Sequence, residues 1–185
     1  MTNGMPRNPP MTATLERELD LGPLGAKFII RKTAVETGGR SFEMEMEMLP
    51  HTGGTPLHIH PHAVEEYEVM EGTFEVNVAG VWKTAAVGER IFINEGVPHT
   101  FRNSGDQPVR VYNVHRPAMQ FEDYFRRLYR LANSGVVTSR KMTFKALLHL
   151  SMLMTSYPDE IRSVKPPAGI VRALAGIGRM LGYRI

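Results

Sequence analysis

The chain has 185 residues, of which 42% are hydrophobic and 22% charged, and its formal net charge at pH 7 is +3. This length and composition predict one domain of an ordinary soluble globular protein, with room for an appendage. The absence of cysteine excludes disulfides, thiol nucleophiles and cysteine-ligated zinc sites.

The N-terminal segment has the composition of a flexible tail. Residues 1–12 are polar and rich in Pro, Asn and Thr, so we expect such a tail over residues 1–20. The segment lacks the charged and apolar regions of a leader peptide, and no apolar run in the chain has the length of a membrane span. These features favour a cytoplasmic protein.

Residues 27–115 carry the pattern of an all-β domain. In residues 41–48, Phe42, Met44, Met46 and Met48 alternate with glutamates, which predicts a strand with its apolar side chains inward and its glutamates outward. Many short strands separated by Gly, Pro and Asn turns are typical of a sandwich or a barrel. The further predicted strands cover residues 27–33, 65–69, 73–78, 90–93, 99–103 and 108–115, and one lies near Trp82.

After Pro117 the hydrophobic period changes to that of helices. Phe121, Tyr124, Phe125 and Leu128 fall at helical spacing and predict a helix over residues 121–131. Residues 143–157 are strongly apolar and predict a buried helix. Two prolines at 166–167 indicate the start of a third helix, which is expected to run to about residue 181.

The charge is unevenly distributed between these two parts. Residues 1–115 contain 10 Lys/Arg against 15 Asp/Glu, whereas residues 116–185 contain 12 against 4. We therefore expect a barrel over residues 21–116 and a helical extension over residues 117–185. The extension is expected to pack on the acidic outer face of the barrel or on a partner subunit, or to cover the open end of the barrel. On the outer face, the complementary groups would be Glu43, Glu45 and Glu47 with Arg126, Arg127 and Arg130.

A group of imidazoles and one carboxylate predicts a metal site. His58 and His60 are two residues apart, so on a strand both side chains lie on one face. Glu65 and His99 add a hard oxygen ligand and a third imidazole. A set of nitrogen and oxygen ligands without thiolate suits divalent Fe, Mn, Ni, Co or Zn.

The spacing of these residues resembles the two motifs of the cupin superfamily. The first motif is Gly-x5-His-x-His-x3–4-Glu-x6-Gly, and His58, His60, Glu65 and Gly72 fit it. Thr52 stands where the first glycine is expected.

The second motif, Gly-x5-Pro-x-Gly-x2-His-x3-Asn, lies closer to the C-terminus. Gly88, Gly96, His99 and Asn103 fit it, and Asn94 replaces its proline. Both departures from the motifs are turn positions and not ligands. The resemblance covers roughly residues 40–115 and leaves residues 118–185 unexplained, although a Leu-Gly-Tyr ending at Tyr183 is similar to that of a group of small cupin-domain proteins.

This resemblance implies a mainly β fold, the double-stranded β-helix or jelly roll, with a C-terminal α-helical extension. It implies one divalent transition metal per chain (Fe, Mn, Ni or Zn) bound by His58, His60, Glu65 and His99. The family includes dioxygenases, decarboxylases, isomerases and sugar-binding regulators, so the fold alone does not identify a reaction. Single-domain members usually dimerise, and we expect a homodimer.

The expected function is that of a metal-dependent, dioxygenase-like enzyme acting on a small organic molecule in the barrel. Glu65 and Tyr67 are the candidate catalytic residues, as base and as general acid. The alternatives are a non-redox isomerase, lyase or decarboxylase, and a barrel that binds a small ligand without catalysis. The basic helices are not expected to bind a membrane, and no recognised nucleic-acid motif is present.

Several side chains near these motifs have two interpretations. His62 is expected at the surface or behind the ligands, with a fifth-ligand role as the alternative. His115 is expected at the surface, or at the cavity mouth in contact with substrate, and His51 and His149 are interpreted as structural. Tyr67 lies two residues after Glu65, and Phe101 two after His99, so on straight strands each shares a face with that ligand. Both side chains would then face the cavity or pack in the core.

Overall fold

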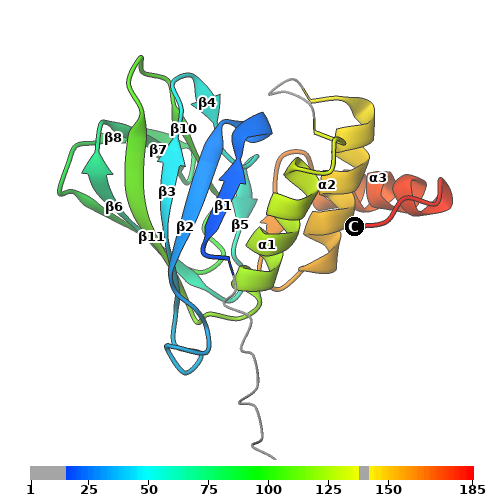
Figure 1. The fold of residues 1–185 in the computed structure, drawn as a ribbon, viewed down its shortest axis with the longest axis horizontal. Coiled ribbons are helices and arrows are strands. Elements are labelled where there is room, and N and C mark those ends of the chain that lie inside the picture. Colours follow the sequence, from blue (N-terminus) through cyan, green and yellow to red (C-terminus); the bar gives the residue numbers. More distant parts are fainter. Residues whose placement is uncertain (1–15, 138–141) are drawn as a thin grey trace, which may run out of the picture.

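The computed structural model describes residues 16–137 and 142–185 and contains two facing β-sheets with helices on one side (Figure 1). The first sheet has the order β1-β2-β3-β11-β6-β9 and the second β12-β5-β10-β7-β8, with β4 paired to β10. This is the expected jelly roll. The strands of the first sheet are β1 (Glu18–Leu21), β2 (Ala26–Lys32), β3 (Phe42–Met48), β6 (Val64–Glu71), β9 (Arg90–Ile93) and β11 (Val109–Arg116). Those of the second are β4 (Thr52–Gly53), β5 (His58–Ile59), β7 (Phe74–Val78), β8 (Val81–Ala85), β10 (His99–Asn103) and β12 (Arg162–Ser163).

The helical extension also has its predicted form. It contains α1 (Phe121–Ala132), α2 (Phe144–Ser156) and α3 (Ala168–Met180), and a short 3-10 turn, η1 (Gly22–Leu24), follows β1. Thr143 caps α2, because its Oγ1 accepts a hydrogen bond from the Ala146 amide at 3.1 Å. None of the described helices is long and apolar enough to cross a membrane.

Two predicted boundaries need correction. β1 begins at Glu18 and buries Leu19 and Leu21, so the tail predicted over residues 1–20 is too long; residues 1–15 lie outside the described part of the chain. The alternation of charged and apolar residues in Glu18–Leu21 could have predicted this strand from the sequence. In addition, β12 belongs to the predicted extension yet pairs with β5, so the barrel is not confined to residues 21–116.

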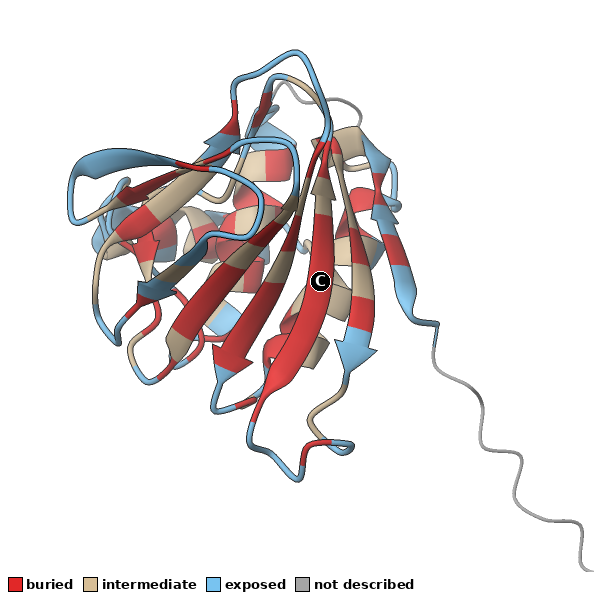
Figure 2. Cartoon of the chain, turned by 90° about the vertical axis from the view of Figure 1, so that its left-hand side faces the viewer, coloured by how far each residue is buried: buried red, intermediate tan, exposed pale blue. Residues whose placement is uncertain are grey.

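The inner face of the first sheet forms the core, as the alternation in β3 predicts. Phe42, Met44, Met46 and Met48 are all buried there. The strands in Figure 2 are buried along much of their length, because side chains on the outer face also cover one another.

The extension packs at the open side of the barrel and not on the acidic outer face. In Figure 1 the helices gather beside β1 and β5. Phe125 of α1 inserts among inward-facing rings, with its centroid 5.2 Å from that of Phe28 and 5.8 Å from that of Phe42. Of the two alternatives within one chain, a cover over the open end is therefore the one realised, and packing on a partner subunit stays a prediction.

The predicted ion pairs between the strand glutamates and the helix arginines are wrong. Within α1, Arg126 pairs with Glu122 and Arg127 with Asp123, each at i,i+4 spacing, and Arg130 lies 3.9 Å from Asp123. The local pairs form because both partners already lie on the same helix face. On β3, Glu43 and Glu45 point away from the core but are themselves buried by neighbouring strands.

Glu45 is bound by two arginines of adjacent strands. Its Oε1 accepts a hydrogen bond from Arg31 Nε at 2.7 Å, and its Oε2 accepts one from Arg110 Nη1 at 3.0 Å. The hydrogen bond from Arg31 is the main cause that holds the pKa of Glu45 below its ordinary value of 4.5, against the effect of burial. The carboxylate is therefore charged and fully paired at neutral pH.

We expect Glu45→Gln to lower the free energy of unfolding at neutral pH by about 2 kcal/mol, because two hydrogen bonds lose their charged acceptor. The folded pKa lies below the unfolded one, so this contribution is present above pH 4.5 and is lost as the pH falls through the folded pKa. Urea unfolding over a pH series should show wild type and variant converging in acid. Glu47→Gln, on the same face of β3, is the matched control and should change stability little. A difference that stays constant into acid would contradict the assignment.

Candidate metal centre

The four predicted ligands meet inside the barrel. His58 on β5 stands opposite His99 on β10 in the strand register, His60 follows β5, and Glu65 lies on β6 of the facing sheet. One ligand atom from each of these side chains lies within 4.8 Å of all the others. The four residues are 3%, 0%, 4% and 3% exposed, in that order, so the group is closed off from solvent. The structure thus brings together all four predicted metal ligands.

The three imidazoles are each held through Nδ1 by a backbone carbonyl group. The Nδ1 atoms of His58, His60 and His99 donate to the carbonyl oxygens of Pro56 at 2.9 Å, Glu160 at 2.6 Å and Val97 at 2.8 Å. A carbonyl oxygen only accepts, so each Nδ1 carries the ring proton in the neutral imidazole. Each Nε2 is then left with a free lone pair, which is the arrangement of metal-binding histidines.

The two carboxylate oxygens of Glu65 have different neighbours. Its Oε1 accepts a hydrogen bond from Asn113 Nδ2 at 2.9 Å and lies 3.2 Å from His115 Nε2. Its Oε2 faces the histidines, 2.9 Å from His99 Nε2 and 3.4 Å from His60 Nε2. Asn113 and His115 therefore orient the carboxylate so that one oxygen remains available as a ligand.

The atoms at the centre fit a metal ion. His60 Nε2, His99 Nε2 and Glu65 Oε2 are buried, and when the imidazoles are neutral all three atoms are acceptors, so none of them can satisfy another. Leaving such atoms unsatisfied is costly. Two ligands about 2.1 Å from one ion and at right angles to each other lie about 3 Å apart, close to the separation of His99 and Glu65. A divalent cation would satisfy all of these atoms together.

The electrostatics favour the metal-binding forms of His58 and Glu65. Burial, followed by the charges of His99 and His60, lowers the pKa of His58 well below its ordinary value. Burial acts to raise the pKa of Glu65, but the charges of His60 and His115 hold it well below its usual range. Although burial opposes it, Glu65 raises the pKa of His99, so a metal that binds there displaces a proton.

His115 is a functional candidate that the sequence prediction placed wrongly. It was expected at the surface or at a cavity mouth, but it is 1% exposed and its ring stacks on that of Phe121 with centroids 4.0 Å apart. The sequence contained a clue to the buried position of His115, because alternate residues of a strand share a face and so place His115 on the same face as Asn113. In the structure both face inward on β11, and His115 stands opposite Glu65 in the register. Burial lowers the pKa of His115 and favours its neutral form.

The other histidines lie away from the centre. His62 is exposed, with its Nε2 3.7 Å from Asp159 Oδ1, so it is a surface residue and not a fifth ligand. His51 is also exposed. His149 lies on α2 and stacks on Tyr183 with centroids 4.6 Å apart, in agreement with a structural role.

Tyr67 and Phe101 both face the interior, as strand parity predicts. Tyr67 is 1% exposed, and its ring lies 5.0 Å from Phe74 and 5.9 Å from Phe101. Burial, together with the negative charge of Glu65, raises the pKa of Tyr67 well above its ordinary value. The phenol is therefore protonated and can donate a hydrogen bond but not act as a base; its catalytic role stays a prediction.

The helical extension completes this centre. Ser163 of β12 pairs with His58 of β5, and the carbonyl that holds His60 belongs to Glu160. From α1, the ring of Phe121 lies 5.2 Å from that of His60. Two of the three imidazole ligands thus depend on residues outside the two motifs.

We expect His115→Phe to weaken metal binding by about 10–100-fold while the protein stays folded, since outer residues that orient a ligand have effects of this size. Phenylalanine can keep the stacking on Phe121 but cannot contact Glu65 through a nitrogen. Metal affinity is measured by competition with a chelator of known strength. His62→Phe, a change of the exposed histidine, should leave the affinity unchanged. Equal affinities in all three proteins would show that His115 does not position the carboxylate.

Comparison with protein families agrees with the geometry. Residues 44–115 match the family model described as the cupin domain. No curated protein matches the chain.

The solved structures that this chain resembles have low sequence identity to it. KdgF from a Halomonas species is 17% identical, with a TM-score of 0.51 over 58% of this chain and 91% of that one. An RmlC-like cupin from Shewanella frigidimarina is 21% identical, with a TM-score of 0.47 over 57% and 86%. A recombinant oxalate oxidase in complex with glycolate is 23% identical, with a TM-score of 0.44 over 51% and 52%. At these identities, the likeness to KdgF concerns the fold alone.

Proposed function

The chain contains a cupin domain, and from this premise we propose that it is a metal-dependent enzyme, dioxygenase-like, that acts on a small organic molecule bound in the barrel. One observation carries the proposal. Three imidazoles, whose Nδ1 atoms donate to backbone carbonyl groups, direct their Nε2 atoms toward one carboxylate oxygen, and all four residues are buried. Four nitrogen and oxygen ligands leave positions open on a six-coordinate ion, as a catalytic site requires.

The ion would be held by His58, His60, His99 and Glu65 Oε2. When bound, such an ion polarises a substrate oxygen and, if it is redox-active, supports electron transfer to dioxygen.

The residues around the ligands provide orientation and proton transfer. Asn113 and His115 hold Glu65 Oε1, so the carboxylate keeps a fixed direction even when its other oxygen exchanges partners. Glu65 can then accept a proton from a substrate hydroxyl, with its lowered pKa favouring the charged form at the start of the reaction. Tyr67, protonated and buried next to this carboxylate, is the candidate donor to a developing negative charge. Both side chains are buried, which limits the access of water to them.

A second candidate function is a non-redox reaction, an isomerisation, lyase step or decarboxylation. It is favoured by the methionines of β3: Met44, Met46 and Met48 face the barrel interior and are 2%, 2% and 1% exposed. Thioethers inside the same barrel as an oxygen-activating metal are open to oxidation to sulfoxide. A Lewis-acid reaction would leave these side chains intact.

The experiment begins with the metal content of protein purified without added metal, measured by mass spectrometry. Oxygen consumption is then followed with a panel of catechols, flavonols and diketones. Retained iron together with substrate-dependent oxygen uptake supports the dioxygenase. Zinc or manganese without oxygen uptake from any compound would exclude it and favour the non-redox reaction. Stabilisation by a compound of the panel without any turnover would instead indicate a barrel that only binds its ligand.

A further inference from the structure

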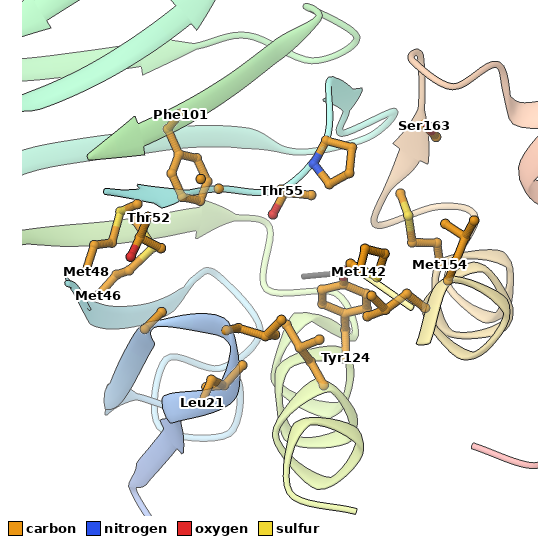
Figure 3. A pocket seen from close by; sticks show the side chains of 18 of the residues that line it. Leu21, Met46, Met48, Thr52, Thr55, Phe101, Tyr124, Met142, Met154 and Ser163 are labelled. Atoms are coloured by element: carbon orange, nitrogen blue, oxygen red, sulfur yellow. The ribbon is translucent and has the colours of Figure 1, made fainter. Parts of the chain in front are cut away.

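A cavity of about 410 Å³ lies at the seam between the barrel and the helical extension. Figure 3 shows it from close by: Met46, Met48 and Phe101 border it from the strands, and Tyr124 and Met154 from the helices. Ligand sites in proteins have volumes of roughly 300–1,000 Å³ and mostly apolar walls. The cavity has the size of a small-molecule site.

The cavity is distinct from the candidate metal centre. None of the four ligand side chains lines it. Phe101 stands in the wall on the barrel side, and its ring contacts Tyr67 with centroids 5.9 Å apart, so aromatic rings lie between the cavity and the carboxylate of Glu65. Nine of the 23 residues that line it come from α1, α2 and the segment after α2, which lie outside the part of the chain that matches the cupin model.

The lining excludes a charged occupant. It contains no Lys, Arg, Asp or Glu, and His51 at the rim is exposed, with its Nε2 3.0 Å from Asp106 Oδ1. Of the four Ser and Thr residues in the wall, Thr52 donates to the carbonyl oxygen of Gly25 at 3.3 Å and Ser163 to that of Pro166 at 2.6 Å, and the hydroxyl groups of Thr55 and Ser151 are small polar spots in an otherwise apolar lining. An apolar wall of this kind holds water poorly and favours a hydrocarbon surface.

Tyr124 adds one directional polar group. The residue is 6% exposed, and its hydroxyl makes no hydrogen bond with any other described residue. Its ring is fixed by Phe125 and Tyr157, with centroids 5.3 Å and 5.5 Å away. Burial raises the pKa of Tyr124, so the hydroxyl keeps its proton as a donor.

We propose that this seam cavity binds a neutral, mainly hydrocarbon molecule with one hydrogen-bond-accepting oxygen, which the Tyr124 hydroxyl contacts. With roughly 30 Å³ for each group of the size of water, the volume admits a molecule of about 10–14 non-hydrogen atoms. This site is additional to the barrel site of the proposed enzyme and does not need the metal.

The test uses two probes of equal size. 2-Acetylnaphthalene carries a ketone oxygen, and 2-isopropylnaphthalene replaces that group with hydrocarbon. Affinities are measured directly by isothermal titration calorimetry, with a chelator present throughout so that the metal centre does not contribute. Wild type should bind both probes, and the ketone more tightly.

Tyr124→Phe should weaken the ketone by about 5–10-fold and leave the hydrocarbon unchanged, because only a hydroxyl is removed. Leu150→Trp fills the cavity from α2 and should weaken both probes at least tenfold; Phe144→Trp, on the exposed start of the same helix, should weaken neither. The proposal is overturned if wild type binds neither probe, if Tyr124→Phe affects both probes equally, or if Leu150→Trp, when folded, binds like wild type. Since Tyr124→Phe removes a single atom, it decides the question even if the tryptophan variant does not fold.

Discussion

The double variant His58→Ala/His60→Ala should bind no divalent transition metal at the stoichiometric level, whereas wild type should bind one ion per chain. Both imidazoles present a free Nε2 to the same point, and their removal leaves only His99 and Glu65 as ligands. Two ligands cannot hold a first-row ion against competition from buffer and water. Metal content after dialysis, measured by mass spectrometry, gives the direct readout.

The same difference should appear in stability. A metal present at a free concentration of 100 times its Kd stabilises a binding protein by about 2.7 kcal/mol. For a chain of this length, that corresponds to a rise in Tm of roughly 5–10 °C. Wild type should show this rise and the double variant none. His62→Ala, which removes an exposed histidine of the same segment, should behave as wild type.

The metal-free double variant also serves as a check on folding. Its circular dichroism should match that of metal-free wild type, because the ligands contribute little to the apolar core. If the folded double variant retained one ion per chain with unchanged affinity, the site would have to lie elsewhere. The proposed function would then fail together with the assignment of the ligands.

The part of this centre that the sequence predicts is the part governed by local geometry. Period-two alternation predicts β3 and its buried methionines, since side chains on a strand alternate between two faces. The spacing of His58 and His60 predicts a shared direction for the same reason. The link to Glu65 and His99 comes from the resemblance to the two cupin motifs, and the structure brings all four together.

What the sequence does not predict depends on contacts between distant segments. The carbonyl group that holds His60 belongs to Glu160, 100 residues away, and a backbone carbonyl leaves no trace in residue type. His115 could be placed on the inner face by parity, but its burial depends on Phe121 covering it. For the arginines of α1, the sequence analysis predicted distant partners where the structure has local ones. A long-range charge match with β3 was expected, and pairs one helical turn apart formed in its place.

Phe121→Ala should lower the free energy of unfolding by about 3–5 kcal/mol, the usual range for truncating a buried phenylalanine. The side chain is 1% exposed and begins α1, where its ring stacks on His115 and meets the edge of His60. Its loss leaves a cavity next to two residues of the candidate metal centre. Urea unfolding of the metal-free protein measures this effect, and Phe144→Ala, at the exposed start of α2, should change stability by less than about 0.5 kcal/mol.

The metal affinity of Phe121→Ala shows whether Phe121 only packs against the barrel or also positions the ligands. If α1 holds the imidazoles in place, Phe121→Ala should also weaken metal binding by about tenfold or more, because His60 and His115 gain freedom to move away from the centre. Phe121→Leu retains most of the buried volume and should recover stability more fully than metal affinity, since leucine cannot stack on an imidazole. A variant with a large loss of stability but an unchanged affinity would show that the helix only closes the barrel. A loss of both stability and metal affinity would show that the helical extension positions the ligands of the metal centre.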